Sequence, residues 1–313
     1  MKEILFLEPV MKEMIWGGDR LRTEYGYDIP SEKTGECWAI SAHSKGDCII
    51  KNGTFENWTL SRLFAEHREL FGNVEGDVFP LLVKIIDARE DLSIQVHPDD
   101  NYAKEHENGA LGKTECWYIL DCDKDAKIVI GHSANSKEEL RQMIENKEWD
   151  KLIHVRSIKK GDFFQIEPGT VHAIKAGTLI LETQQSSDVT YRLYDYDRLQ
   201  NGKPRELHIE KSIDVIRCPQ QDTSVAPTVT QFPKATVTQL VSCPFYCVKK
   251  IETNGELTIS QDEPFTIMSI LEGEGTLDKV PVKKGDHLIL PANYGTYHLC
   301  GTMMIITSAM TTR

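Results

Sequence analysis

The sequence predicts a mainly β protein with two barrel-like units and a small helical insertion. Short strand-like segments, separated by turns that contain Gly and Pro, recur at intervals of about ten residues, as in sandwiches and barrels. A Lys-Lys-Gly-Asp segment followed by an apolar strand, a Pro turn and a His occurs twice, beginning at Lys159 and at Lys283. This repeat indicates that one supersecondary unit is duplicated.

The first half of the chain reads as strands around one short helix. Residues 37–43 and 47–53 are strand-like, and a helix-like stretch runs from about Leu60 to Phe71. The segment 78–98 is rich in Val, Leu and Ile and is broken by the turn 87–91, so it predicts two adjacent strands.

The clearest helix is predicted from Ser136 to Trp149. Ser136 is a suitable N-cap, Glu139 follows three residues later, and apolar residues recur at helical spacing. This helix reads as an insertion between strands.

These elements divide the chain into three parts. We expect residues 1–217 to form the domain that holds the candidate functional site, with helical insertions near 57–72 and 136–152. Residues 218–235 are rich in Pro, Thr and Gln and read as a linker. Residues 236–313 predict a second barrel without metal ligands, because its His298 is not preceded by a His-containing strand.

Composition excludes several classes of function. A net charge of -12 and the absence of a Lys/Arg run argue against nucleic acid as a partner. No uncharged apolar stretch approaches the length of about 18 residues that a membrane span needs. The eight cysteines are scattered without a repeated spacing, which favours reduced thiols and a cytoplasmic location. The sequence carries no signal for a particular oligomeric state.

Four residues in strand-like contexts look like the ligands of one metal ion. Gln95 and His97 are two apart, so on an extended strand their side chains leave the same face. Glu115 lies in the apolar run Glu-Cys-Trp-Tyr-Ile-Leu, where an unpaired carboxylate is costly to bury, and His172 ends Glu-Pro-Gly-Thr-Val-His. A lone His is more often a hydrogen-bonded core residue, but the combined set suits a divalent ion such as zinc with positions open to substrate.

Several longer motifs resemble a known family. The segments 93–103 (SIQVHPDDNYA), 112–120 (GKTECWYIL), 167–174 (EPGTVHAI) and 181–198 (LETQQSSDVTYRLYDYDR) resemble the type I phosphomannose isomerases, which are zinc enzymes of the cupin superfamily. The resemblance extends to Trp16 in IWGG and to Glu36 in TGECWAIS, and so covers most of the chain. It implies that the two barrels are cupin-type jelly rolls.

The resemblance also implies an activity. Members interconvert mannose 6-phosphate and fructose 6-phosphate, moving a proton between C1 and C2 through a cis-enediol. The family pattern implies one Zn²⁺ per chain, bound by Gln95, His97, Glu115 and His172. Of the other matching residues, Lys113 and Arg192 would act on and bind the sugar phosphate, and Trp16 and Glu36 would line the cleft.

Some alternatives stay open at this point. Lys113 also reads as a solvated turn lysine, and Arg192 as a surface cation paired with Asp195 or Asp197. Where longer members carry Asn-His-Lys-Pro-Glu, this chain has Leu-Gly-Lys-Thr-Glu at 111–115, so the family His is missing.

Two other functions fit parts of the pattern. Two His and one carboxylate also form the centre of non-haem iron oxygenases, although Gln95 as an additional ligand argues against this reading. A non-catalytic sugar-binding cupin with a metal is the other alternative.

Overall fold

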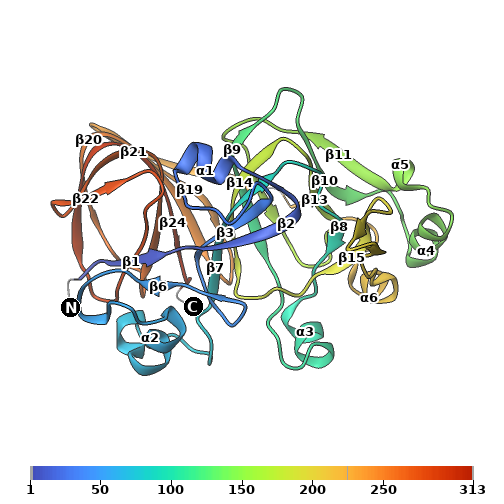
Figure 1. Cartoon of the computed structure of the whole chain (residues 1–313), viewed down its shortest axis with the longest axis horizontal. Helices are drawn as coiled ribbons and strands as arrows, with labels where there is room; N and C mark the ends of the chain where they lie inside the picture. Colours follow the sequence, from blue (N-terminus) through green and yellow to red (C-terminus); the bar gives the residue numbers. More distant parts are fainter. Residues whose placement is uncertain (1–2, 224, 312–313) are drawn as a thin grey trace.

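The structure is a computed structural model that describes residues 3–223 and 225–311. Strands dominate, and every strand pairing among the described residues is antiparallel, in agreement with the mainly β prediction (Figure 1). Three large sheets account for most strands, and two short ribbons complete the set. None of the described helices is long and apolar enough to cross a membrane.

The largest sheet contains the C-terminal strands together with two strands from the start of the chain. Its strands are β18 (Thr228–Phe232), β19 (Ala235–Ser242), β20 (Cys247–Ser260), β24 (Thr296–Ala309), β21 (Thr266–Leu277) with β22 (Val280–Lys283), β23 (His287–Leu290), β1 (Leu5–Glu8) and β6 (Ile49–Ile50). Leu5 pairs with Ile289, so the N-terminal strand completes the C-terminal barrel.

The other two large sheets form the barrel that carries the candidate site. One has β11 (Ile153–Ser157), β10 (Lys127–His132), β13 (His172–Ile174), β8 (Ile94–Val96) and β15 (Tyr191–Tyr194). The second has β12 (Phe163–Ile166), β9 (Glu115–Cys122), β14 (Thr178–Gln185), β7 (Leu81–Ala88), β2 (Val10–Gly18) and β3 (Thr34–Ile40). Trp117 and Ile180 of one sheet share a buried cluster with Ile128 and Ile174 of the other, so apolar burial holds the two sheets together.

Short helices and two ribbons connect the strands. They are α1 (Arg20–Tyr25), η1 (Gly53–Phe55), α2 (Leu60–Glu66), η2 (Arg68–Phe71), α3 (Asp100–His106), α4 (Lys137–Glu145), α5 (Trp149–Leu152) and α6 (Ile209–Val215), with the ribbons β4 (Ala42–His43)–β5 (Gly46–Asp47) and β16 (Leu199–Gln200)–β17 (Lys203–Pro204).

The helix predicted from Ser136 is present but ends early. The Ser136 hydroxyl accepts a hydrogen bond from the Glu139 amide, as a capping residue should. The helix stops at Glu145, and Lys147 adopts a left-handed φ of 55° before α5 begins. The stretch predicted from Leu60 to Phe71 is likewise present, as α2 and η2.

The predicted linker contains a strand that sequence analysis missed. Within 218–235, residues Thr228–Phe232 form β18 and pair with β19. The run Thr228-Val229-Thr230 favours an extended strand, although the segment as a whole is rich in Pro and Gln. The division at residues 217 and 235 stays a prediction, but β1 and β6 pair with C-terminal strands and so do not belong to the first barrel alone.

The repeated Lys-Lys-Gly-Asp segments adopt the same turn. Gly161 and Gly285 have left-handed φ angles of 89° and 93°, which a residue with a Cβ tolerates poorly. In each copy the Asp carboxylate accepts a hydrogen bond from the amide of the first Lys, over 3.0 Å at Lys159 and 2.8 Å at Lys283. The local geometry therefore repeats in both barrels.

The second barrel nevertheless has an apolar interior. His298 is exposed on β24, whereas its neighbours Tyr297 and Leu299 are buried in a cluster with Met268 and Leu288. The histidine of the second copy therefore faces away from the barrel core.

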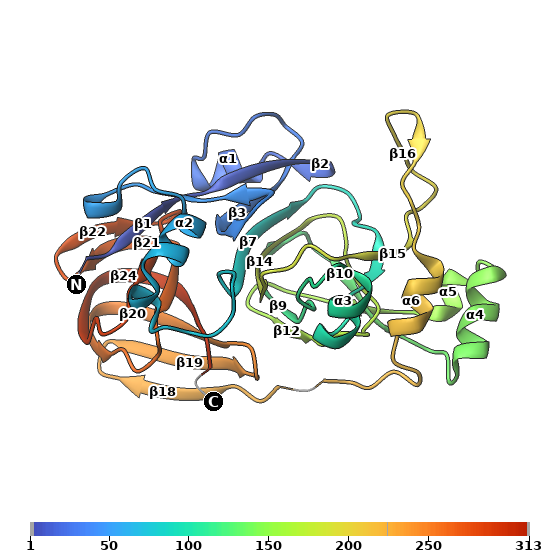
Figure 2. The same ribbon diagram turned by 90° about the horizontal axis from the view of Figure 1, so that it is seen from below.

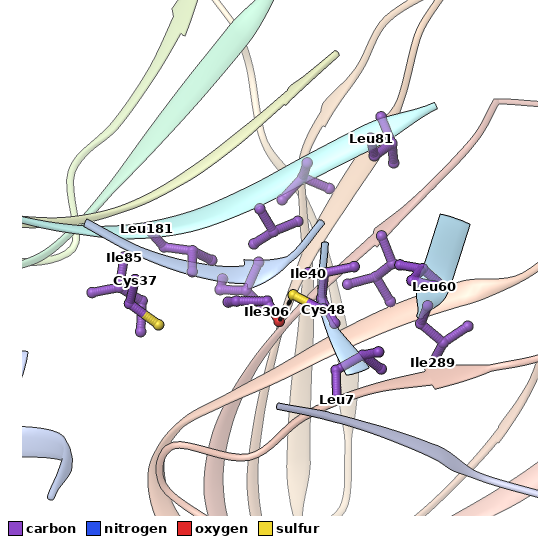
Figure 3. Packing of buried hydrophobic residues seen from close by; sticks show 14 of the residues in the cluster. Leu7, Cys37, Ile40, Cys48, Leu60, Leu81, Ile85, Leu181, Ile289 and Ile306 are labelled. Carbon is purple, nitrogen blue, oxygen red and sulfur yellow. Dashed lines mark hydrogen bonds between the residues drawn. The ribbon is translucent and has the colours of Figure 1, made fainter. Parts of the chain in front are cut away.

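One core joins the two barrels. Figure 3 shows that Leu7 and Ile40, from the N-terminal strands, lie in the same buried cluster as Leu181 of the first barrel and Ile289 and Ile306 of the second. Because this packing is continuous, the position of each barrel is fixed relative to the other by close-packed side chains.

Candidate metal centre and its cavity

Two buried imidazoles lie side by side in the first barrel, His172 on β13 and His97 directly after the neighbouring strand β8. Nε2 of His97 lies 3.1 Å from Nε2 of His172. The Nδ1 atom of His97 lies 2.8 Å from the carbonyl oxygen of Val189, and that of His172 lies 2.8 Å from the carbonyl oxygen of Thr170. Donation of Nδ1–H to a carbonyl fixes the tautomer and leaves Nε2 with a free lone pair. Both rings are thus arranged as metal ligands.

A carboxylate completes this group. Glu115 begins β9 and is fully buried. Its Oε2 lies 3.4 Å from Nε2 of His97, and its Oε1 lies 3.4 Å from Nε2 of His172. Oε1 has no hydrogen-bond partner among the described residues, which is costly for a buried acceptor.

The spacing of these atoms fits a metal ion. Tetrahedral ligands with bonds of about 2.0–2.1 Å lie roughly 3.4 Å from one another. The separations of 3.1, 3.4 and 3.4 Å among His97, His172 and Glu115 are close to that value. One ligand atom from each residue lies within 4.8 Å of the others. The residues present therefore fit a divalent ion.

The register of the strands brings Gln95 to the same centre. Gln95 pairs with His172 on one side and with Arg192 on the other. Its side-chain amide lies 3.4 Å from Nε2 of His172, and a rotation about the last bond exchanges the amide oxygen and nitrogen. Gln95 is thus within reach of the same ion, and Arg192 is its neighbour on β15.

Burial and charge set the protonation of the ligands. Burial, followed by the ammonium of Lys113, lowers the pKa of His97 to about 3, and burial also lowers the pKa of His172. Burial opposes ionisation of Glu115, but the ammonium of Lys113 holds the pKa of this carboxyl well below its usual range. At neutral pH the set is two neutral imidazoles and one carboxylate, which is the state that binds metals.

The centre lies beside a cavity of about 430 Å³. Its charged lining comprises six cations, Lys12, Lys45, Lys84, Lys113, Arg192 and Arg205, and three acids, Glu36, Glu182 and Asp188. The chain as a whole has 36 basic and 48 acidic residues. The cavity thus reverses the average charge of the protein and favours an anionic ligand.

A buried ion network forms part of the cavity wall. Nζ of Lys84 lies 3.3 Å from Oε1 of Glu182 and 3.8 Å from Oε2 of Glu36. Trp38 donates its indole N–H to Glu36 over 2.6 Å, and Trp117 donates to Glu182 over 3.0 Å. Because each carboxylate contacts both an indole N–H and the Lys84 ammonium, the network fixes the orientation of these side chains.

The charges of this network perturb each other. Burial opposes the charge of Lys84, but Glu36 and Glu182 hold the pKa of this amine above its ordinary value. Burial and the neighbouring charge of Glu115 raise the pKa of Glu182. Perturbed groups in a cavity are typical of functional sites.

All eight residues selected from the sequence lie in or beside this site. Gln95, Lys113, Arg192, Trp16 and Glu36 line the cavity, and His97, Glu115 and His172 are buried next to it. Their roles stay predictions, but their positions do not fit the surface alternatives. Lys113 is only 4% exposed, so it is not a solvated turn lysine. Asp195 pairs with Arg198 and Arg205 rather than with Arg192.

Sequence analysis missed Lys84, Glu182 and Arg205. The signal for two of them was available, because Lys84 and Glu182 are single charges in the apolar strands LLVKII and LILET. The argument applied to Glu115, that a buried charge needs a partner, applies to both. No such signal marks Arg205, which follows a polar, turn-rich segment.

Together, the β barrel, the His–Glu–His centre and the polar cavity define a metal-binding barrel protein. Comparison with known proteins specifies the class further. The family model for the catalytic domain of type I phosphomannose isomerase matches residues 4–123, and that for the mannose-6-phosphate isomerase cupin domain matches residues 236–310.

Relatives of known name match along the whole chain. The chain is 51% identical over 311 residues to mannose-6-phosphate isomerase ManA of Bacillus subtilis, covering 98% of each chain. It is 51% identical over 313 residues to the mannose-6-phosphate isomerase of Streptococcus mutans, again covering 98% of each.

Solved structures agree with this match. The crystal structure of a mannose 6-phosphate isomerase from Bacillus subtilis matches with a TM-score of 0.97 at 51% identity, covering 98% of this chain and 99% of that one. A phosphomannose isomerase variant from Salmonella typhimurium shares the fold with a TM-score of 0.79 at 17% identity, covering 99% and 100% of the two chains. The chain belongs to the type I phosphomannose isomerase family, and the predicted cupin-type fold is confirmed.

Proposed function

We propose that this protein is a zinc-dependent isomerase that interconverts mannose 6-phosphate and fructose 6-phosphate. Its similarity to the Bacillus subtilis and Streptococcus mutans enzymes over nearly the full chain supports the reaction. The observation that carries the mechanism is the convergence of His97, Glu115 and His172 beside a cation-lined cavity. Gln95 of the proposed ligand set lines this cavity, so the ion would lie beside it, which favours a catalytic metal over a closed structural site.

The ion is held by Gln95, His97, Glu115 and His172 in this proposal. Two imidazoles, a carboxylate and an amide oxygen suit Zn²⁺, a borderline ion that accepts nitrogen and oxygen ligands. When bound, it would polarise the oxygen atoms at C1 and C2 of the sugar and so favour the enediolate. The carbonyls of Val189 and Thr170 keep the two imidazoles oriented.

Lys113 is the proposed proton carrier. Its Nζ lies 3.1 Å from Nε2 of His97 and 2.6 Å from Oε2 of Glu115, and it lines the cavity. An amine at this point would lie beside a sugar whose C1 and C2 oxygens face the ligand set. A positioned general acid–base typically contributes about 10²–10⁴ in rate.

Arg192 is proposed to stabilise negative charge on the substrate. It lies next to Gln95 across the β8–β15 pairing and lines the cavity. Its Nε is buried without a hydrogen-bond partner among the described residues, so a donor is available to an anionic oxygen. The cations of the cavity also suit a phosphate dianion, and Trp16 and Glu36 contribute to the wall.

An isomerase assay on zinc-loaded protein tests this function. Fructose 6-phosphate formed from mannose 6-phosphate is measured by a coupled reaction, with free mannose as the control substrate. Turnover of the phosphorylated sugar alone is expected. Binding of mannose 6-phosphate without conversion would instead support the sugar-binding cupin, and dioxygen consumption with Fe²⁺ would support the oxygenase.

We also propose a cytoplasmic location, because sugar phosphates are made and used in that compartment. All eight cysteines are free, which suits a reducing compartment.

A further inference from the structure

Arg205, which lines the cavity, directly follows a ribbon that protrudes from the molecule. The β16–β17 ribbon stands away from the body of the molecule (Figure 2), and residues 199–204 are exposed. Immediately after it, Arg205 turns inward: its side chain is only 15% exposed and lines the cavity, whereas Glu206 and Leu207 are exposed again. Because the ribbon before it is exposed, the long side chain of Arg205 needs a further contact to be held in one orientation.

Asp195 holds this arginine in place. Its carboxylate is 5% exposed and accepts a hydrogen bond from Nε of Arg205 over 2.7 Å, with a second contact to Nη2 of the same residue. Arg198, the residue directly before β16, donates to Asp195 over 2.6 Å. A two-point contact with a planar guanidinium fixes its direction as well as its distance.

The carboxylate does not balance the positive charge around it. Arg192, Arg198 and Arg205 surround one buried acid, and Asp195 bonds only two of them. Arg192 instead donates Nη1 to the carbonyl of Glu206 over 2.8 Å. Burial, followed by the like charge of Arg205, lowers the pKa of Arg192. Two guanidinium groups kept on one cavity wall against their mutual repulsion form a site for an anion.

We infer that Asp195 is a positioning residue: it holds Arg205 in the cavity so that Arg205, together with Arg192, grips the phosphate of the substrate. This inference rests on the proposed function and deepens it, because it names the part of the cavity that separates a sugar phosphate from the free sugar. Arg205 contributes to binding in the ground state and the transition state alike. Its loss therefore raises KM and leaves kcat nearly unchanged.

Kinetics of two variants and one control test this inference. Arg205→Gln and Asp195→Asn are each expected to raise KM for mannose 6-phosphate at least about tenfold, the scale of one hydrogen bond to a charged group, with kcat within about twofold of wild type. Glu210→Gln is the matched control, because it breaks the exposed two-point pair with Arg141 outside the cavity. The control is expected to leave KM unchanged.

The double variant separates positioning from general structural damage. If Asp195 acts through Arg205, then Asp195→Asn adds nothing further to KM once Arg205→Gln is present. An unchanged KM in either single variant, additive effects in the double variant, or a fall in kcat at constant KM would each overturn the inference. Should Asp195→Asn fail to fold, Arg205→Lys decides, because it keeps the charge and is expected to recover part of the loss seen in Arg205→Gln.

A binding measurement distinguishes this inference from the proposed function. Calorimetric titration with inorganic phosphate needs no turnover, and wild type and Glu210→Gln are expected to bind at least about tenfold more tightly than Arg205→Gln and Asp195→Asn. Absence of isomerase activity in wild type with this pattern intact would refute the proposed reaction alone. Equal phosphate affinity in all the proteins would refute the anion site.

Discussion

Nζ of Lys113 lies 2.6 Å from Oε2 of Glu115. Glu115 begins strand β9, and Lys113 lies two positions before it. The pair brings a cation and a carboxylate to the same face of the chain. The same amine lies 3.1 Å from Nε2 of His97. It therefore contacts the ligand set without being part of it.

Replacing Lys113 by Met tests its role in proton transfer. Met keeps most of the length and apolar volume of Lys but carries no proton, so we expect kcat to fall by about 10²–10⁴. Bound zinc, measured by elemental analysis, is expected to stay near one per chain. Lys160→Met, which removes an exposed ion pair with Glu272, is the control. Zinc loss in parallel with the loss of rate would instead make Lys113 a supporting residue of the metal site.

The two imidazoles are expected to be individually essential for metal binding. His97→Ala or His172→Ala removes one ligand and leaves the carboxylate of Glu115 less well paired, so both zinc content and turnover should be lost. The second barrel should remain folded, because its inner cluster, which includes Met268 and Leu288, contains no residue of β8 or β13. His298→Ala, at an exposed histidine, should retain full metal content. Zinc-loaded protein after either ligand replacement would contradict the assignment.

Strand β1 is expected to be essential for the second barrel. Leu7 is 2% exposed in the shared core, so Leu7→Ala should lower the free energy of unfolding by about 2–5 kcal/mol in urea titrations. Leu199→Ala, at a residue 64% exposed, should change it by less than about 0.5 kcal/mol. The fragment 236–313 lacks the partner of β23 and should not unfold cooperatively. A cooperative transition in this fragment would show that the barrel is independent.

Buried His287 predicts a loss of stability in acid. Burial, with a smaller contribution from Lys51, lowers the pKa of His287 to about 3, and the ring contacts Ser269 and Tyr27 over 2.8 Å each. Burial raises the pKa of Tyr27, so this partner stays neutral. The unfolded chain, with a His pKa of about 6.5, binds this proton first. Stability from His287 is therefore complete above about pH 6.5 and falls as pH drops toward 3.

The variant His287→Gln measures this contribution. Its deficit in unfolding free energy relative to wild type should be about 2 kcal/mol smaller at pH 5 than at pH 7.5, because glutamine does not titrate. The same measurement on His298→Gln, at an exposed position of the same barrel, is the control for the loss of a histidine side chain. A deficit that does not change with pH would mean that His287 contributes packing alone.

Local rules predicted much of the fold and most of the metal centre. The alternation of a strand identified Gln95 and His97, the cost of burying a charge identified Glu115, and a capping residue located the helix after Ser136. These signals are all contained within a few residues. They needed no knowledge of which strands pair.

The parts that were missed depend on long-range pairing. Nothing near Leu5 indicates that it pairs with Ile289, and the strand Thr228–Phe232 is defined by its partner β19 more than by its composition. In the sequence, Arg205 looks like a surface residue of a polar, turn-rich segment. Its inward orientation depends on the contact with Asp195, which the sequence does not reveal. Tertiary context decides such positions.

Metal titration of chelated protein tests the central claim most directly. Protein freed of metal by a chelator is assayed for conversion of mannose 6-phosphate while Zn²⁺ is added in known amounts. If Gln95, His97, Glu115 and His172 hold one ion that the reaction needs, activity is absent at the start and rises to a plateau at one Zn²⁺ per chain. Full turnover by the metal-free protein would contradict the account.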